Sequence, residues 1–134
     1  MTTHAAGTFD VQLASQGSPD AAEGISLGGM SIAKQFHGPL DGTSKGAMLT
    51  AMTEATGAAA YVAIERVSGS LQGRRGSFTL MHNGTMTRHG QQLAVTVVPG
   101  SGTGGLAGLA GTMAIEIVDK KHLYDFTYTL PANS

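Results

Sequence analysis

The chain has 134 residues, a formal net charge of −1 and only 13% charged residues. This size predicts a single domain, residues 1–134, and the sparse charge excludes the clustered lysines and arginines of a nucleic-acid-binding surface. Cysteine does not occur, which excludes disulfides and zinc–thiolate sites, and no apolar run reaches membrane-spanning length. Because the N-terminus also lacks a signal-peptide pattern, we expect a cytoplasmic protein with no nucleic-acid or membrane partner.

Alternation of apolar and polar residues predicts a chain that is almost entirely β. The predicted strands cover residues 8–15, 29–38, 59–71, 76–90, 92–100, 112–119 and 122–130, and the ends at 1–7 and 131–134 are predicted to be flexible. Residues 45–63 fit both strand and helix patterns; we favour a strand that ends near Ala51 and is followed by an irregular or helical turn. Asn83-Gly84 predicts a hairpin turn inside 76–90, and residues 119–121 predict the last hairpin turn.

Glycine is the compositional outlier, with 20 residues. A G-x-L-x-G pattern recurs at 38–42, 69–73 and 104–108, each time between predicted strands. We interpret each copy as a corner, in which glycine allows a sharp turn and leucine closes the end of the core. About eight strands joined by such corners predict a small closed antiparallel barrel with room for one small ligand.

The third corner overlaps a letter match to a dinucleotide-binding pattern, G-x-G-x-x-G at residues 100–105. That pattern functions only when a helix follows it, and a phosphate-binding P-loop also needs a lysine. Gly108 and Gly111 disfavour a helix, and no lysine occurs between Lys45 and Lys120. We therefore predict a strand connection at the barrel rim and no cofactor.

Several longer segments carry a resemblance. They are residues 34–38 (KQFHG), 61–69 (YVAIERVSG), 76–84 (GSFTLMHNG), 97–104 (VVPGSGTG) and 124–128 (YDFTY). Together they resemble a bacterial family of uncharacterised function whose known folds are similar to the allene oxide cyclase barrel. The resemblance implies an eight-stranded barrel and a homo-oligomer, and it assigns no reaction.

Two ionisable residues are the catalytic candidates. Glu65 shares a predicted strand face with Tyr61, Ala63 and Val67, whereas Arg66 lies on the opposite face. A carboxyl group inside a barrel is expected to have a raised pKa and to act as a general acid or base; the alternative is a solvent-facing or structurally paired Glu65. His82 follows Phe78 and Leu80 on one face and is either a proton carrier or a structural group. No two histidines have metal-ligand spacing, so we predict no metal.

Aromatic residues and methionines are the candidates for ligand contacts. The predicted lumen-facing aromatic residues are Tyr61, Phe78, Tyr124, Phe126 and Tyr128. Their alternative role is the core or an interface, because alternating aromatic residues are common in both. Met48, Met52 and Met81 fill core gaps or line an adaptable apolar pocket.

These features predict a barrel that binds a small, mostly apolar molecule in its lumen. An acid/base isomerisation or cyclisation by Glu65 or His82 would need no cofactor. Two alternatives remain open: a non-catalytic carrier or sensor that uses the same pocket, and a structural oligomer whose barrel is filled by side chains.

Overall fold

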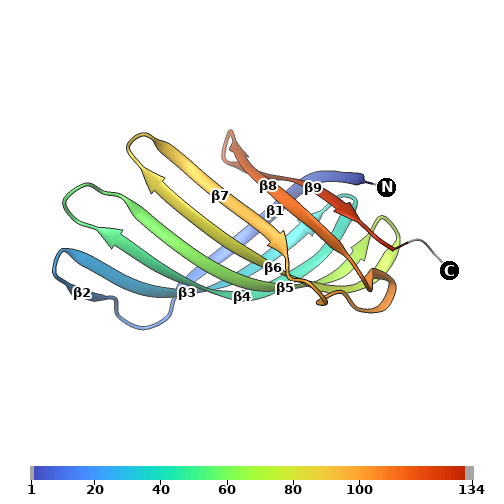
Figure 1. Cartoon of the computed structure of the whole chain (residues 1–134), viewed down its shortest axis with the longest axis horizontal. Coiled ribbons are helices and arrows are strands. Elements are labelled where there is room, and N and C mark those ends of the chain that lie inside the picture. Colours follow the sequence, from blue (N-terminus) through green and yellow to red (C-terminus); the bar gives the residue numbers. More distant parts are fainter. Residues whose placement is uncertain (1, 132–134) are drawn as a thin grey trace.

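The computed structural model describes residues 2–131. Its elements are β1 (Thr3–Ser15), β2 (Asp20–Ala22), β3 (Ile25–His37), β4 (Leu40–Thr53), β5 (Ala59–Leu71), β6 (Arg74–Thr87), β7 (Gly90–Val97), the 3-10 turn η1 (Gly104–Leu106), β8 (Ala110–Val118) and β9 (Lys121–Thr129) (Figure 1). The strands form one antiparallel sheet in the order β1-β9-β8-β7-β6-β5-β4-β3-β2, and pairing of β1 with β3 closes it. The predicted all-β fold with a closed eight-stranded antiparallel barrel is confirmed, and β2 is a short addition beside β3.

The chain ends differ from the sequence prediction. β1 begins at Thr3 and pairs with β9 from that residue on, so the predicted flexibility of segment 1–7 is wrong for residues 3–7. Pro131 follows β9 without strand structure, and residues 132–134 of the predicted C-terminal tail lie outside the described residues. Within residues 2–131 no helix is long and apolar enough to cross a bilayer.

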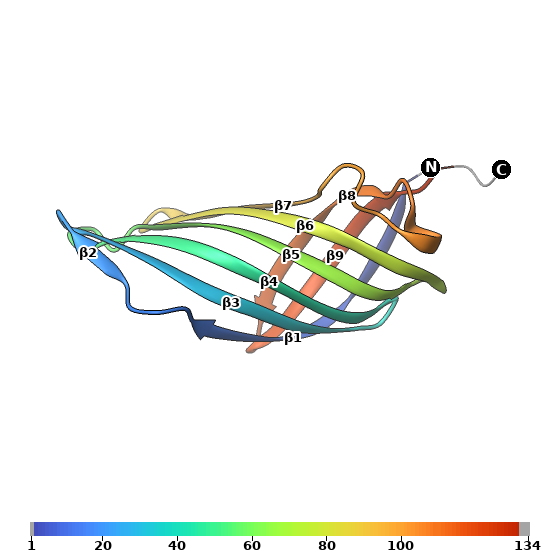
Figure 2. The ribbon, with the colours of Figure 1, turned by 90° about the horizontal axis from the view of Figure 1, so that it is seen from below.

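The barrel has a closed end and an open end. β3, β4, β5 and β6 have 13 or 14 residues each, whereas β7, β8 and β9 have 8 or 9. Among the described residues β7 pairs with β8 only at Thr96 and Thr112, and the β8–β9 hairpin crosses one end of the long strands (Figure 2). We call the end with the β3–β4 turn, the β5–β6 turn and η1 the closed end. The end with the β4–β5 and β6–β7 turns is the open end.

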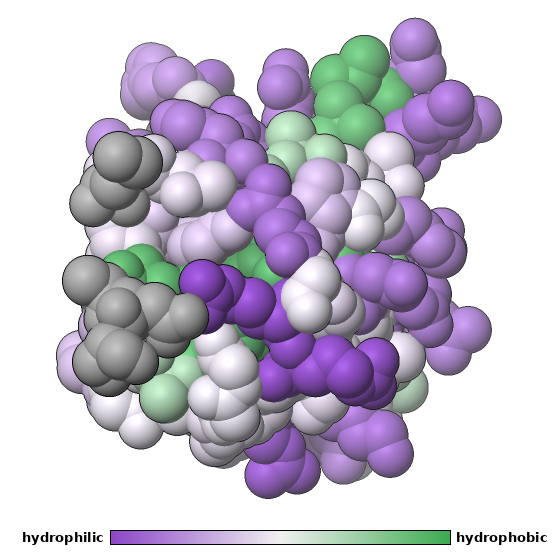
Figure 3. Space-filling view, turned by 90° about the vertical axis from the view of Figure 1, so that its right-hand side faces the viewer, coloured by the Kyte–Doolittle hydropathy of each residue, from purple (hydrophilic) through white to green (hydrophobic). Residues whose placement is uncertain are grey.

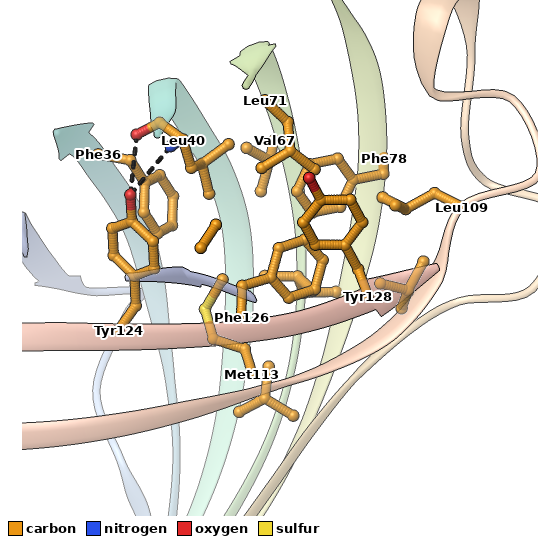
Figure 4. Packing of buried hydrophobic residues seen from close by; sticks show 14 of the residues in the cluster. Phe36, Leu40, Val67, Leu71, Phe78, Leu109, Met113, Tyr124, Phe126 and Tyr128 are labelled. Atoms are coloured by element: carbon orange, nitrogen blue, oxygen red, sulfur yellow. Dashed lines mark hydrogen bonds between the residues drawn. The ribbon is translucent and has the colours of Figure 1, made fainter. Parts of the chain in front are cut away.

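The leucines of the three G-x-L-x-G corners fill the closed end. Leu40, Leu71 and Leu106 are each at most 1% exposed, and Leu40 lies directly opposite Leu71 in the register of β4 and β5. The backbone N–H of Leu40 donates to the Tyr124 hydroxyl at 3.0 Å, which ties β9 to this corner (Figure 4). Figure 3 views this end from outside and shows mostly polar and neutral residues over the core. The corner interpretation of the repeat is therefore confirmed.

The glycine-rich segment 98–109 is a rim connection, as the sequence predicts. Its backbone runs beside β6, because the N–H of Val98 donates to the Thr79 carbonyl and the N–H of Thr103 donates to the Ser77 carbonyl. The N–H of Ser77 in turn donates to Thr103 Oγ1. These hydrogen bonds pair backbone groups along the edge of β6 beyond the end of β7. A covering loop of this kind prevents an exposed strand edge from pairing with another chain. The only helical structure in the segment is the three-residue η1.

The predicted hairpin turn at Asn83-Gly84 is wrong. β6 continues through both residues to Thr87, and the chain turns at residues 88–89 instead. Gly84 lies opposite Tyr61 in the neighbouring strand, and a Cβ atom on Gly84 would lie 2.5 Å from a ring carbon of Tyr61. The glycine is therefore required for aromatic packing across the sheet rather than for a turn.

Two other turn predictions are confirmed. β8 and β9 are joined at Asp119 and Lys120, whose φ values of 51° and 67° are both positive, as a type I′ turn requires. The ambiguous segment 45–63 contains a strand followed by a turn, and the strand continues past Ala51 to Thr53.

Candidate functional site

Four polar side chains meet inside the barrel, one from each of four neighbouring strands. Lys34 comes from β3, Ser44 from β4, Glu65 from β5 and His82 from β6, and all four are buried. They point inward because they alternate with outward-facing neighbours on strands whose other inward residues form the core. We call these four residues the Glu65 cluster.

Glu65 is the centre of the cluster and is 0% exposed. Its Oε1 accepts a hydrogen bond from Lys34 Nζ at 2.8 Å and contacts His82 Nε2 at 2.6 Å. Its Oε2 accepts from the Ser44 hydroxyl at 2.6 Å. An ionised carboxylate can only accept, so Nε2 of His82 carries the proton that points at Glu65. Both carboxylate oxygens are thus satisfied by charge-assisted bonds.

The surroundings of Glu65 favour its charged form. Burial alone would raise the pKa of Glu65, but the hydrogen bond from His82, the positive charge and hydrogen bond of Lys34, and the hydrogen bond from Ser44 together lower it from 4.5 to about 2. The expected raised pKa is therefore wrong. The sequence puts Glu65 and Arg66 on opposite strand faces without deciding which one faces the lumen, and it does not reveal the partners that override desolvation.

Two further features support this arrangement. Lys34 Nζ lies 4.9 Å from the ring centre of Phe9 and 5.8 Å from that of Phe36, so the aromatic faces stabilise the part of the ammonium that Glu65 does not contact. Gly46 lies opposite Glu65 in β4, and a Cβ atom there would come within 2.7 Å of the Cβ atom of Glu65. The absence of a side chain at position 46 thus lets β4 lie close to the backbone of β5 beside Glu65.

His82 connects the cluster to the open end. Its Nδ1 has no hydrogen-bond partner among residues 2–131, and every fully buried side-chain nitrogen or oxygen of these residues has one. Nδ1 is therefore reached by solvent, while Nε2 is held by Glu65. The ring of Tyr61 lies 6.3 Å from the His82 ring, and burial together with the charge of Glu65 raises the pKa of Tyr61. The Tyr61 hydroxyl consequently stays protonated at neutral pH.

The residues described by the structure contain no group of three or more histidines and carboxylates placed to hold a metal ion. A shallow hollow of about 470 Å³ lies on the outer surface over β1, β8 and β9, away from the Glu65 cluster. Its wall includes Glu116 and Asp125 but no buried charged group. The cluster, not this hollow, concentrates the chemistry of the molecule.

The sequence model of a family described as "Protein of unknown function (DUF3224)" matches residues 5–128. The chain belongs to the DUF3224 family. It is 45% identical to a DUF3224 protein of unknown function from Shewanella oneidensis MR-1, whose crystal structure matches with a TM-score of 0.92 over 98% of this chain and 99% of that one. No curated protein matches the chain. The uncharacterised-family part of the resemblance is confirmed, and the likeness to allene oxide cyclase stays a prediction.

In this DUF3224 protein the two predicted catalytic residues are in direct contact, although 17 positions separate them. Tyr61 lies beside them, on the side of the open end. The other four predicted ligand contacts, Phe78, Tyr124, Phe126 and Tyr128, belong to the packed core of the closed end (Figure 4). The hydroxyl of Tyr124 donates to the Leu40 carbonyl, and that of Tyr128 donates to the side-chain oxygen of Gln72. These four side chains are engaged with the protein itself and lie away from the open end.

The sequence interpretation overlooked Lys34 and Ser44, and it placed one methionine on the wrong side. Lys34 follows Met30 and Ile32 on a predicted apolar strand face, and a lone cation on such a face was the available signal. Ser44 gave no signal, because serine is common on either face. Met48 and Met52 face inward as predicted, whereas Met81 alternates with the buried Leu80 and His82 and lies on the outer surface.

Proposed function

We propose that this DUF3224 protein binds a small, mostly apolar molecule at the open end of its barrel, against Tyr61 and His82. One observation carries the proposal: inward-facing apolar side chains at this end are exposed, including Met52 at 55%, Met86 at 48% and Leu93 at 40%. On the same strands the inward positions nearer the closed end are fully packed. An apolar surface continuous with the core, left open to solvent, is typical of a ligand site.

The lining favours an adaptable site with few polar anchors. Met30 lies directly opposite Met48 on β3 and β4, and Met52 and Met86 flank Ala59 at the rim. Methionine is flexible and polarizable, so it fits ligands of different shape. Orientation would come from the hydroxyl of Tyr61 and Nδ1 of His82, the polar groups next to this surface.

The contact between Glu65 and His82 favours an acid/base step on the bound molecule. A carboxylate that fixes one ring nitrogen orients the imidazole, while the other nitrogen exchanges a proton with the ligand. His82 is the proton carrier in this proposal, because a pKa of about 2 keeps Glu65 ionised and makes it a weak base. A carrier or sensor would use the same surface without this step.

The alternative of a structural oligomer whose barrel is filled by side chains explains only the closed end. Core residues fill the closed end, as a barrel without a ligand requires. The exposed inward-facing methionines and leucines of the open end have no role in that alternative, whereas a bound apolar molecule would cover them.

Binding can be tested with a matched pair of variants on β4. Met52 faces inward and Leu49 faces outward, three residues apart, and both are more than half exposed. The wild type is expected to bind the neutral fluorescent probe N-phenyl-1-naphthylamine. Met52→Glu should weaken binding by about tenfold or more, because a carboxylate is costly in an apolar site, and Leu49→Glu should leave it unchanged. Absence of binding to the wild type, or the reverse order of the two variants, would exclude the proposed site.

A further inference from the structure

The contact between Glu65 and His82 fixes which ring nitrogen of His82 carries the proton. The Glu65 carboxylate accepts from every partner it has, so the proton between the two residues belongs to Nε2 of His82. Lys34 already balances the charge of Glu65, and a second proton on His82 would leave an unbalanced positive charge in a site where that ring is only 3% exposed. Nδ1 of the neutral ring therefore has a lone pair and accepts a hydrogen bond.

Two polar groups beside the open end have no partner within the protein. No group among residues 2–131 donates to Nδ1 of His82, although this atom is not sealed from solvent. The hydroxyl of Tyr61 likewise makes no hydrogen bond to the described part of the chain, and its ring lies 6.3 Å from the His82 ring. This hydroxyl keeps its proton at neutral pH and is available as a donor. A free acceptor and a free donor thus lie on neighbouring strands.

The same surface provides no charge with which a ligand could pair. Beyond the Glu65 cluster toward the open end, the inward-facing strand residues within residues 2–131 are all uncharged. The ammonium group of Lys34 is bound by Glu65 at 2.8 Å and packs on the ring of Phe9. A ligand carboxylate would therefore lose its hydration at this surface and gain no free counter-charge, which is costly.

We propose that the molecule bound at the open end is an uncharged hydroxyl compound, an apolar alcohol or phenol. This inference rests on the proposed binding site and specifies its ligand class. The ligand hydroxyl donates to Nδ1 of His82, and its oxygen accepts from the Tyr61 hydroxyl, so both free groups of the protein are satisfied. An ether or a ketone can accept from Tyr61 but leaves Nδ1 without a donor. A carboxylate lacks the donor as well, and it brings a charge that the site does not balance.

Three ligands with the same ring system test the proposed class: 2-naphthol, 2-methoxynaphthalene and 2-naphthoate. Their dissociation constants are measured at neutral pH by displacement of N-phenyl-1-naphthylamine. The wild type should bind 2-naphthol about tenfold or more tightly than either of the others, because only this ligand gives the buried acceptor a donor. Equal affinity for 2-naphthol and 2-methoxynaphthalene, or tighter binding of 2-naphthoate, would overturn the hydroxyl class and leave the binding site standing. If N-phenyl-1-naphthylamine itself does not bind, the site is excluded and the ligand class with it.

Two variants separate the acceptor from the donor. In His82→Gln the amide nitrogen takes the place of Nε2 and still donates to Glu65, but no acceptor remains at the position of Nδ1. This variant should bind 2-naphthol and 2-methoxynaphthalene within about twofold of each other. Tyr61→Phe removes a donor that both ligand oxygens use, so it should weaken both ligands and keep the preference for 2-naphthol at about tenfold. A His82→Gln protein with unchanged circular dichroism and the wild-type preference would overturn the role of Nδ1.

Discussion

Replacing Glu65 with glutamine is expected to lower the free energy of unfolding by about 3–5 kcal/mol. Glutamine has nearly the same shape, so packing is retained, but the negative charge that neutralises Lys34 is lost. The Lys34 side chain is only 6% exposed, and its ammonium group would stay in the interior with no opposite charge. Urea unfolding followed by circular dichroism measures the loss, since the chain has no tryptophan.

A second variant separates charge from packing. Lys34→Met combined with Glu65→Gln removes both charges and retains a long apolar side chain at position 34. Because a buried ion pair can be exchanged for neutral groups at small cost, the double variant should recover most of the stability. If Glu65→Gln alone leaves the urea midpoint unchanged, or if the double variant is as unstable as the single one, the ion pair is not what the cluster contributes.

Acid should destabilise the fold through the same residue. The pKa of Glu65 is about 2 in the folded chain and 4.5 in the absence of these contacts. The folded state therefore binds fewer protons, and the stability that Glu65 provides is complete above pH 4.5 and is lost as the pH falls toward 2. A difference of about 2.5 in pKa corresponds to about 3 kcal/mol.

Matched glutamine variants test whether Glu65 causes this pH dependence of the stability. Between pH 6 and about 3 the wild type should lose most of that free energy, and Glu65→Gln should show a flatter profile over the same range. Glu116→Gln, at an exposed position of β8, should keep the wild-type profile. A Glu65→Gln profile parallel to that of the wild type would show that other carboxyl groups cause the loss.

The sequence predicted the structure correctly where a feature depends on a single strand or turn. Alternation in 59–71 placed Glu65 and Arg66 on opposite faces of one strand, and the recurring G-x-L-x-G pattern located the buried leucines of the closed end. These features depend on side-chain direction and local turn geometry, which are properties of short segments.

The sequence predictions were wrong where a feature depends on a strand that is distant in the chain. Asn83-Gly84 has the composition of a turn, but the opposing Tyr61 needs the glycine and β5 is long enough to pair beyond it. The pKa of Glu65 depends on Lys34, 31 residues away, through a pairing order that no local pattern contains. Non-local pairing therefore accounts for both errors.

Methionine methyl groups can show whether the open end of the barrel binds a ligand. Met30, Met48, Met52 and Met86 face inward at this end, Met81 faces outward and Met113 is buried in the core. In spectra of protein labelled with ¹³C at the methionine methyl groups, N-phenyl-1-naphthylamine should shift the signals of the four inward residues and leave those of Met81 and Met113 in place. Shifts at Met81 without shifts at the four inward methionines would exclude the open end as the ligand site.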